Sequence, residues 1–376
     1  MARIGLDVRY LSHGLVGGIH TYLKNFVPAL LQTATDHHFF LYADTKRPFE
    51  LQSLPSNVTL RLLPYHNPLS SIYNDLFMRR QMASDMLNLA HFTASYGFGP
   101  TASRTVITLQ DEINILPLSD IVHGHAKNAR TIAMMTYLHY CTRAALRSAD
   151  AVITVSEYSR RQIVRYSSLG QQKIVPVPHA CPHDIRRIES TSELAEVRQR
   201  LGLTKPFVLA EAFKNPAVLV RAWKSLPSNL RESSEIIFFS RSANVLPIVQ
   251  EAVDAGYARL LVRPMRSDLS ALYSMTQVFV FPSWIEGFGI PLVEAMTCGA
   301  PIIASDRGAI PEVVADAALL MDAEDDQTLA RYLTQLLERP DTREQWRARG
   351  LIRAAHFSWP DIARQVLDCY QQVLAA

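Results

Sequence analysis

One stretch of this sequence combines a buried strand, a glycine turn and a helix start, and few folds accommodate that order. Residues 277–281 are apolar and rich in β-forming side chains, as expected for a strand of a parallel sheet that is buried on both faces. Gly287 and Gly289 then permit a tight turn. Pro291 stands where a helix begins, a position that suits proline because its missing N–H would have no partner there. The stretch therefore predicts one strand-to-helix unit of an α/β fold with a parallel sheet.

The same turn offers groups for a ligand that carries both phosphate and hydroxyls. Free N–H groups at a helix start, together with the positive end of the helix dipole, favour a phosphate. Glu286 and Glu294 bracket this helix start, and carboxylates accept hydrogen bonds from hydroxyls. These groups together favour a nucleotide-sugar. The residues alone equally allow a structural turn, with Glu286 beside the helix dipole and Glu294 on a solvated face.

Strand and helix patterns alternate along both halves of the chain, which predicts two doubly wound, Rossmann-like domains facing across a cleft. The length of 376 residues supports this division, because it exceeds what one ordinary hydrophobic core holds. We expect the first domain over residues 1–180 and the second over residues 181–356, with the polar segment 181–206 as the linker. Residues 3–10 are expected to form the first strand.

Composition excludes some partners and leaves others open. With 48% hydrophobic and 19% charged residues the chain is globular, and a net charge of +3 is too small to indicate nucleic acid. The charge is uneven, with 19 Lys+Arg against 13 Asp+Glu in residues 1–190 and 19 against 22 in residues 191–376. Either an anionic acceptor or membrane surface faces the first half, or the excess is ordinary scatter of surface arginines.

Cysteine usage and hydropathy indicate a reducing compartment and no membrane span. The four cysteines are widely spaced, no basic-apolar leader opens the chain, and no run of eighteen apolar residues occurs. We expect a cytoplasmic protein with reduced thiols. His179, Cys181 and His183 alternate as metal ligands can, but a fourth ligand is lacking, so no metal site is expected.

The sequence of residues 286–296, Glu-Gly-Phe-Gly-Ile-Pro-Leu-Val-Glu-Ala-Met, resembles the paired-glutamate motif of the retaining glycosyltransferases of family 4. Residues 298–305 and 310–314 match the usual continuation of that motif, so the resemblance is strong over residues 273–314 and patchy before them. It implies the GT-B fold and a final helix, residues 357–376, that crosses back onto the first domain. It also implies metal-independent sugar transfer with retention, in which the acceptor attacks from the face that the diphosphate leaves.

The resemblance also implies a donor site. Lys214 would meet the donor diphosphate, Glu286 the hydroxyls of the donor sugar, and Glu294 the ribose. Helix-start amides would stabilise the departing diphosphate, because they are preorganised donors aimed at developing charge. The donor-binding residues expected in this turn are Gly287, Phe288, Gly289, Ile290 and Leu292. Two departures from the family pattern make the donor pocket unusual, namely the acidic Glu211 shortly before Lys214, and Arg263-Pro264 where a glycine is common.

Two places in the first half are also candidates. Gly17 and Gly18 follow the first strand, and the resemblance implies that they border the donor phosphate and the acceptor. The alternative is a tight turn and nothing more; the spacing is not G-x-G-x-x-G, which excludes a dehydrogenase fingerprint. Gln110 and Asp111 end a buried strand where the family usually has His-Asp. Glutamine can position a sugar but cannot exchange a proton near neutral pH, and Asp111 is a poor but nameable nucleophile for a covalent intermediate.

The sequence thus predicts a metal-independent glycosyltransferase of bacterial polysaccharide or lipopolysaccharide type, with no resident cofactor. It would move a hexose or deoxyhexose from a GDP-mannose-like or UDP-sugar donor to a glycan or lipid-linked acceptor. An anionic acceptor at the inner membrane face would meet Arg79, Arg80, Lys127 and Arg130, and His123 or His125 would replace the absent histidine or join a solvated basic face.

Two other functions stay open from the sequence. A non-catalytic, nucleotide-sugar-binding scaffold copy of the fold is suggested by Gln110, Glu211 and Arg263-Pro264. A GT-B epimerase or phosphorylase would share the frame and differ in its products.

Overall fold

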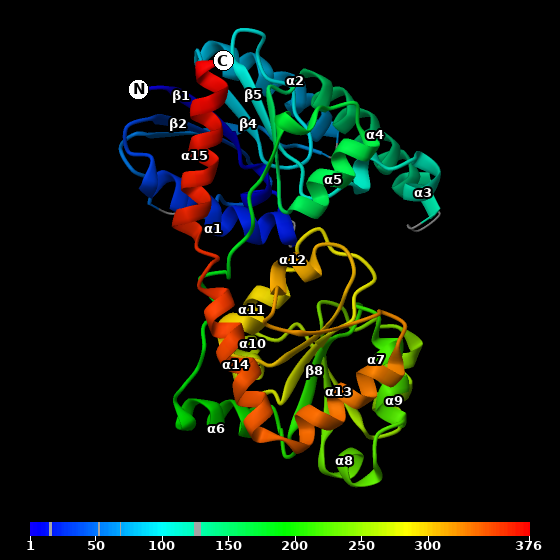
Figure 1. Ribbon diagram of the computed structural model, residues 1–376. Helices are drawn as coiled ribbons and strands as arrows, with labels where there is room; N and C mark the ends of the chain where they lie inside the picture. The colour runs from blue at the N-terminus through cyan, green and yellow to red at the C-terminus, as the bar shows by residue number, and fades with distance from the viewer. Residues whose placement is uncertain (15–16, 52, 68, 124–128) are drawn as a thin grey trace. The chain divides into compact units, whose positions relative to one another are not determined.

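The computed structural model describes residues 1–376 except 15–16, 52, 68 and 124–128 (Figure 1). The chain forms two compact units, one of residues 1–179 with 359–376 and the other of residues 180–358. These boundaries lie within two residues of the positions expected from the sequence. Among the described residues, no helix is long and apolar enough to cross a bilayer.

The first unit is built on a seven-stranded sheet in which all neighbouring strands are parallel. The strand order β3-β2-β1-β4-β5-β6-β7 reverses direction between β1 and β4. The strands are β1 Arg3–Asp7, β2 His38–Asp44, β3 Val58–Leu63, β4 Leu89–Phe92, β5 Arg104–Thr108, β6 Ala151–Thr154 and β7 Ile174–Pro176. The helices are α1 Gly18–Thr33, α2 Leu69–Ser84, α3 Leu118–His123, α4 Ala129–Ser148, α5 Glu157–Tyr166 and α15 Trp359–Ala375.

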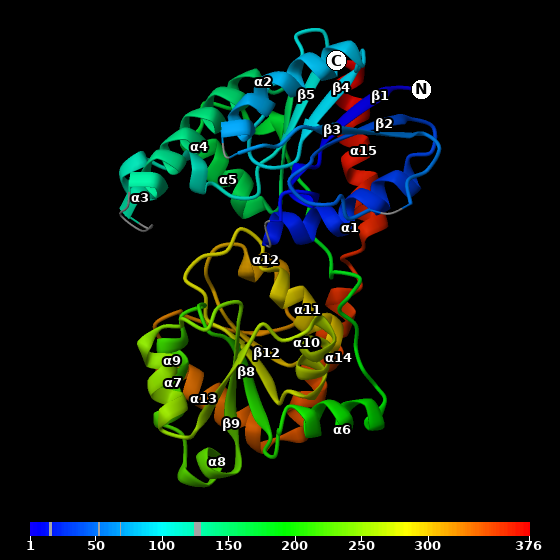
Figure 2. The ribbon, with the colours of Figure 1, turned by 180° about the vertical axis from the view of Figure 1, so that it is seen from behind.

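Helix α15, from the far end of the chain, belongs to this first unit. It packs beside α1, as both views show (Figures 1 and 2). Tyr370 of α15 is fully buried, and its Oη lies 2.6 Å from Nδ1 of His91 in β4, whose Nε2 lies 2.7 Å from Thr108 Oγ1. Burial lowers the pKa of His91 to about 3, so the ring is neutral in this network. The helix is therefore anchored to the centre of the sheet, as the family resemblance implied.

The second unit is built on a six-stranded parallel sheet in the order β10-β9-β8-β11-β12-β13. Its strands are β8 Phe207–Glu211, β9 Glu235–Ser240, β10 Ala258–Val262, β11 Val278–Phe281, β12 Ile302–Ser305 and β13 Leu319–Met321. Its helices are α6 Thr191–Arg200, α7 Pro216–Lys224, α8 Ser228–Ser233, α9 Pro247–Asp254, α10 Arg266–Met275, α11 Ile290–Cys298, α12 Ile310–Val314, α13 Asp326–Glu338 and α14 Pro340–Ala354. The order reverses between β8 and β11, and ligands of doubly wound sheets bind at the carboxyl ends of the strands at such a point.

Two sequence predictions about local structure were wrong. The first strand ends at Asp7 rather than continuing to residue 10, because Asp7 Oδ1 accepts the N–H of Arg9 and a short 3-10 helix, Arg9–Leu11, follows. The segment 181–206 is not only a linker, since it contains α6, whose first turn is capped by Ser190 Oγ accepting the N–H of Glu193.

Candidate functional site

A lysine and a glutamate meet at the switch point of the second sheet. Lys214 follows β8 and Glu286 follows β11, and Lys214 Nζ lies 2.6 Å from Glu286 Oε1. The hydroxyl of Ser283 donates to the same carboxylate oxygen at 2.7 Å. The side chains of Lys214 and Glu286 are 31% and 15% exposed, so the ion pair is sheltered but still open to a ligand. Hydrogen bonds between charged partners in such a place are strong and well oriented.

The residue after Lys214 holds the lysine loop in place. Asn215 has a φ of 52°, in the left-handed region that asparagine tolerates better than most residues. Its Nδ2 donates to the carbonyl of Pro282 at 3.1 Å and to that of Ala323 at 2.7 Å. One carboxamide therefore ties the Lys214 loop to the segments that follow β11 and β13.

The turn that carries Glu286 is braced by the loop after β12. A Cβ on Gly308, whose φ is +61°, would lie 2.6 Å from the carbonyl oxygen of Glu286. The next residue, Ala309, donates its N–H to that same oxygen at 3.0 Å, and Ser305 Oγ donates to the carbonyl of Ser283 at 2.6 Å. This close backbone approach requires glycine at position 308 and fixes where the Glu286 carboxylate begins.

Glu294 is not on a solvated face, because only 4% of it is exposed. Arg266, in the first turn of α10, places its guanidinium 2.7 Å from Glu294 Oε1, and Tyr273 Oη donates to Oε2 at 3.3 Å. Arg266 also pairs with Asp184 at 3.1 Å. Sequence reasoning missed Arg266, and the one signal for it was indirect: a carboxylate buried in a helix needs a cation, without saying which.

The start of α11 offers fewer free amides than expected. Leu292 donates its N–H to the carbonyl of Gly289 at 2.9 Å, which tightens the first turn, so the prediction that this amide serves the ligand is wrong. The N–H groups of Gly289 and Ile290 have no acceptor among the described residues. Gly289 has a φ of 96°, as a glycine at the N-cap permits. Two amides rather than three remain for an anion.

The aromatic residue of the turn has a packing role. Phe288 is 5% exposed and its ring meets that of Phe357 edge-on, with the centroids 5.8 Å apart. The side chain therefore does not serve the donor, and only the backbone of Gly287 and Phe288 is left to do so.

The two departures from the family pattern have different physical outcomes. Burial raises the pKa of Glu211 above its ordinary value, Lys214 and Arg241 oppose the rise, and Glu286 and Glu294 add to it. An acid at this position therefore protonates more readily than usual. Arg263 keeps the backbone shape that glycine would favour, with a φ of 51°, and its Nε donates to the carbonyl of Arg241 at 3.0 Å.

In the first unit, Gln110 is held by a buried histidine. His179 Nε2 lies 2.7 Å from Gln110 Oε1, and the histidine must donate because an amide oxygen only accepts. Burial lowers the pKa of His179 to about 3, so the ring is neutral. Gln110 Nε2 is buried and has no partner among the described residues. This donor points out of the histidine pair and remains for another acceptor.

The other first-unit candidates divide into a local and an open group. Asp111 Oδ1 accepts the N–H of Ile113 at 3.0 Å, which is a turn-capping role. A Cβ added at Gly17 or Gly18 would meet nothing within 4 Å, so neither glycine is required by packing. Among the described residues no group of three His, Cys, Asp or Glu could hold a metal ion, as expected for His179, Cys181 and His183.

The basic residues predicted for an anionic acceptor are only partly described. Arg79 and Arg80 are exposed in the last turns of α2. His125 and Lys127 lie outside the described residues, and the side chains of His123 and Arg130 are likewise not described.

Paired Lys214 and Glu286 beside two open helix-start amides, at a topological switch point, define a doubly wound α/β protein with a site for a phosphorylated ligand. A family model described as Glycosyl transferases group 1 matches residues 209–352, and one described as Glycosyltransferase Family 4 matches residues 16–184. The chain belongs to the group 1, family 4 glycosyltransferases.

Relatives and solved structures agree with this assignment. The chain is 34% identical over 245 residues to the O-antigen chain mannosyltransferase B of Escherichia coli, covering 62% of this chain and 64% of the relative. It is 26% identical over 242 residues to a serotype-specific mannosyltransferase WbdA of Escherichia coli, covering 61% of this chain and 30% of the relative. The match thus spans less than two thirds of either relative.

Two solved structures show the same fold. A sucrose-phosphate synthase from Thermosynechococcus elongatus superposes with a TM-score of 0.73 at 20% identity, covering all of both chains. WaaG, a glycosyltransferase involved in lipopolysaccharide biosynthesis, superposes with a TM-score of 0.71 at 14% identity, covering 97% of this chain and 99% of that one. The two parallel-sheet, Rossmann-like units are those of the GT-B fold.

Proposed function

We propose that this chain is a retaining glycosyltransferase that moves a hexosyl group, with mannose the first candidate, from a nucleoside diphosphate sugar to a glycan acceptor. The observation that carries the proposal is the Lys214–Glu286 pair, with 2.6 Å between Nζ and Oε1 at the switch point of the second sheet. Mannose is suggested by the names of the Escherichia coli relatives.

The pair supplies both halves of what a donor needs. When a diphosphate binds, Lys214 can exchange the Glu286 carboxylate for phosphate oxygens, and Glu286 is then free to accept hydrogen bonds from the sugar. As the glycosidic bond to the diphosphate breaks, negative charge builds on the departing oxygens. Lys214 and the open amides of Gly289 and Ile290 are preorganised to meet that charge. The proposal assigns no step to a metal ion or a resident cofactor.

Glu294 would bind the ribose through whichever oxygen lone pairs Arg266 and Tyr273 leave available. The arginine holds the carboxylate at 2.7 Å, so the acid is ionised and fixed before any donor arrives. In the first unit, Gln110 Nε2 would donate to an oxygen of the donor sugar, because its own Oε1 is occupied by His179. A covalent intermediate on Asp111 is not part of the proposal, since its carboxylate already caps a turn.

The main experiment measures donor binding and transfer separately. Calorimetry with GDP-mannose and with UDP-glucose reports which donor binds, and mass analysis of products with a mannose-terminated glycan reports transfer. Lys214→Ala should lower turnover by about 10²–10³, the loss expected when one preorganised donor to a developing anion is removed. Lys224→Ala, an exposed lysine at the end of α7, is the matched control and should leave turnover unchanged.

Two outcomes favour the other functions. Donor binding without any transfer would favour the scaffold copy, for which the buried acid Glu211 beside Lys214 is the supporting observation. Conversion of the donor without an acceptor to an epimer, or with phosphate to a sugar phosphate, would favour an epimerase or phosphorylase.

We further place the reaction in the cytoplasm at the inner face of the membrane, with a lipid-linked acceptor. The exposed pair Arg79 and Arg80 and the basic excess of the first half support this. Sedimentation with anionic liposomes should show binding that weakens as ionic strength rises past ~0.15 M. An Arg79→Ser, Arg80→Ser variant should bind less. Indifference of the unaltered protein to anionic liposomes at low salt would remove the membrane from the proposal.

A further inference from the structure

The first unit contains a cavity of its own at the carboxyl edge of its sheet. It lies where β1 and β2 end and where the loop after β4 begins, and its volume is about 190 Å³. One water molecule takes up roughly 30 Å³ in the liquid, so there is room for a polar group the size of a sugar ring. The residues that carry the argument below are Asp7, Arg9, His13, Asp44, Asn74 and Ala94, all of which line it.

The only arginine in the cavity wall is already neutralised. Arg9 forms two bonds to Asp7, from Nε to Oδ1 at 2.9 Å and from Nη2 to Oδ2 at 2.7 Å, and a third from Nη1 to Asp75 Oδ1 at 2.7 Å. Tyr96 and Tyr137 donate their hydroxyls to the other oxygen of Asp75. Three groups carry a net charge of −1 here, so an anionic ligand gains nothing from this arginine.

The other charged pair of the wall has the same effect. His13 Nδ1 lies 2.7 Å from Asp44 Oδ2, and Asp44 is 2% exposed. Its second oxygen accepts the N–H of Lys46 at 3.0 Å. Carboxylates therefore outnumber free cations around the cavity, and a phosphorylated group would be repelled. A neutral ligand rich in hydroxyls fits this lining.

One polar atom of the wall lacks a partner. Asn74 is 1% exposed, and its Nδ2 donates to the carbonyl of Pro64 at 3.0 Å, which orients the amide. Its Oδ1 is buried and has no hydrogen bond among the described residues. Buried polar atoms nearly always have a partner, so an oriented amide oxygen beside a cavity indicates a missing donor such as a hydroxyl.

We propose that this cavity is a subsite for a neutral sugar ring of the acceptor, read by Asn74 Oδ1. The inference rests on the proposed function, which supplies the acceptor, and adds its chemistry: the ring held here is uncharged, even where a lipid-linked acceptor carries phosphate elsewhere. Asp44 and His13 are the neighbouring groups that accept from and donate to the remaining hydroxyls.

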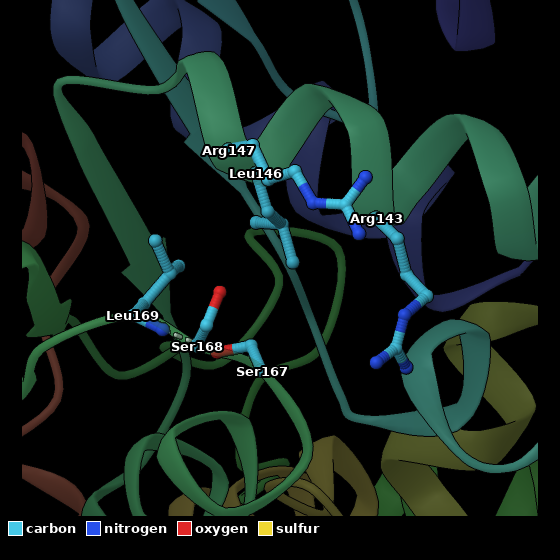
Figure 3. A pocket seen from close by; sticks show the side chains of 6 residues that line it. All are labelled: Arg143, Leu146, Arg147, Ser167, Ser168 and Leu169. Atoms are coloured by element: carbon cyan, nitrogen blue, oxygen red, sulfur yellow. Dashed lines mark hydrogen bonds between the residues drawn. The ribbon is translucent and has the colours of Figure 1, made fainter.

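The second hollow of this unit serves as a contrast. It is lined by Arg143, Leu146 and Arg147 of α4 and by Ser167, Ser168 and Leu169 after α5 (Figure 3). Its volume is about 30 Å³, enough for water and too small for a sugar ring. Substitutions here therefore control for changes elsewhere on the same unit.

The test uses the full chain and three readouts. Calorimetry of a neutral α-linked mannotriose measures acceptor binding without turnover, transfer kinetics give the KM for the same glycan, and hydrolysis of GDP-mannose without acceptor reports the donor half alone. Asn74→Ala should raise the mannotriose Kd and KM about tenfold, as for loss of one oriented hydrogen bond, and leave donor hydrolysis within about twofold. Ala94→Leu, which fills the cavity with an apolar side chain, should do the same without removing a polar partner.

The control and the contrary results are distinct. Ser168→Leu in the small hollow should leave all three readouts unchanged. If both Asn74→Ala and Ala94→Leu bind mannotriose as the unaltered protein does, or if a mannotriose ending in mannose 6-phosphate binds better than the neutral one, the subsite is refuted. Absence of GDP-mannose turnover in the unaltered protein would instead refute the proposed function, and the calorimetric comparison would still decide the subsite.

Discussion

The two units repeat one device and use it differently. Each places an arginine between two carboxylates near the carboxyl edge of its sheet: Arg9 between Asp7 and Asp75 in the first unit, and Arg266 between Glu294 and Asp184 in the second. Arg9 is 14% exposed, and all three of its nitrogens are used, whereas Arg266 is 38% exposed. The first arrangement closes a wall, and the second holds Glu294 while leaving the neighbouring Lys214–Glu286 pair open.

The comparison teaches how burial decides what a charged group can do. A charge that is fully paired inside the protein shapes a surface for a neutral ligand, because its field is cancelled locally. A pair that stays partly exposed, as Lys214 and Glu286 do at 31% and 15%, can be opened by a charged ligand. Similar side chains thus make one unit suited to a neutral sugar and the other to a diphosphate.

The sharpest way to break the comparison is to remove each arginine. Arg9→Ala should destabilise the first unit by about 4–5 kcal/mol and Arg266→Ala the second by ~3 kcal/mol, since each leaves buried carboxylates unpaired. Hydrogen exchange read peptide by peptide assigns the loss to a unit. Arg221→Ala, which breaks an exposed pair with Asp326, is the control and should cost less than ~1 kcal/mol. Equal, small losses for all three variants would show that burial does not distinguish these pairs.

Acid should separate the units next. Burial lowers the pKa values of His91 and His179 to about 3, and both lie in the first unit. Below the unfolded pKa of about 6.5 the unfolded chain takes up protons that the folded unit refuses, so stability falls as pH falls from about 6.5 towards 3. At pH 5 the loss is roughly 2 kcal/mol for each histidine. Hydrogen exchange at pH 7 and pH 5 should therefore show protection lost from β4 and β7 before β8 and β11; the reverse order would contradict these assignments.

A pair of glycine variants sharpens the comparison of the two turns. Gly308→Ala should destabilise the second unit by about 1–3 kcal/mol and displace Glu286, because φ is +61° and the new Cβ would overlap the Glu286 backbone. Gly18→Ala should leave stability unchanged or slightly raised, since nothing lies within 4 Å of its Cβ and alanine favours a helix. Thermal unfolding checks both. If Gly18→Ala nevertheless lowers turnover, that glycine leaves room for substrate; unchanged turnover would make it a turn only.

The smallest expected effect concerns Glu211. Its pKa is raised chiefly by burial, so the folded unit holds the proton longer than the unfolded chain does, and this contribution to stability is lost as pH rises through the folded pKa. Once ionised, the acid also repels a diphosphate. Glu211→Gln should therefore strengthen GDP-mannose binding at pH 7.5 by ~1 kcal/mol and flatten its dependence on pH between 5 and 7.5. Calorimetry at both pH values checks this, and weaker binding by the variant would show that Glu211 contacts the donor directly.

Much of the donor site could be predicted from sequence because it is local. Strand β11, the turn and the start of α11 lie within residues 278–298, so residue types and their spacing were sufficient. The resemblance added Lys214, whose place after β8 brings it to Glu286. The prediction about the Leu292 amide was wrong because spacing alone does not reveal that a helix has tightened its first turn, as its bond to Gly289 shows.

By itself, the sequence determined the fold class, the two-unit division and the turn that carries Glu286, because hydrophobic period, glycine and proline act over a few residues. Only the tertiary structure decided that Arg266 holds Glu294, that Asn215 clamps the Lys214 loop, and that Asn74 faces a cavity. These contacts join segments between 28 and 108 residues apart or walls drawn from several strand ends. Strand order sets which ends become neighbours, and burial sets which charges must pair; neither is written in any one stretch of the chain.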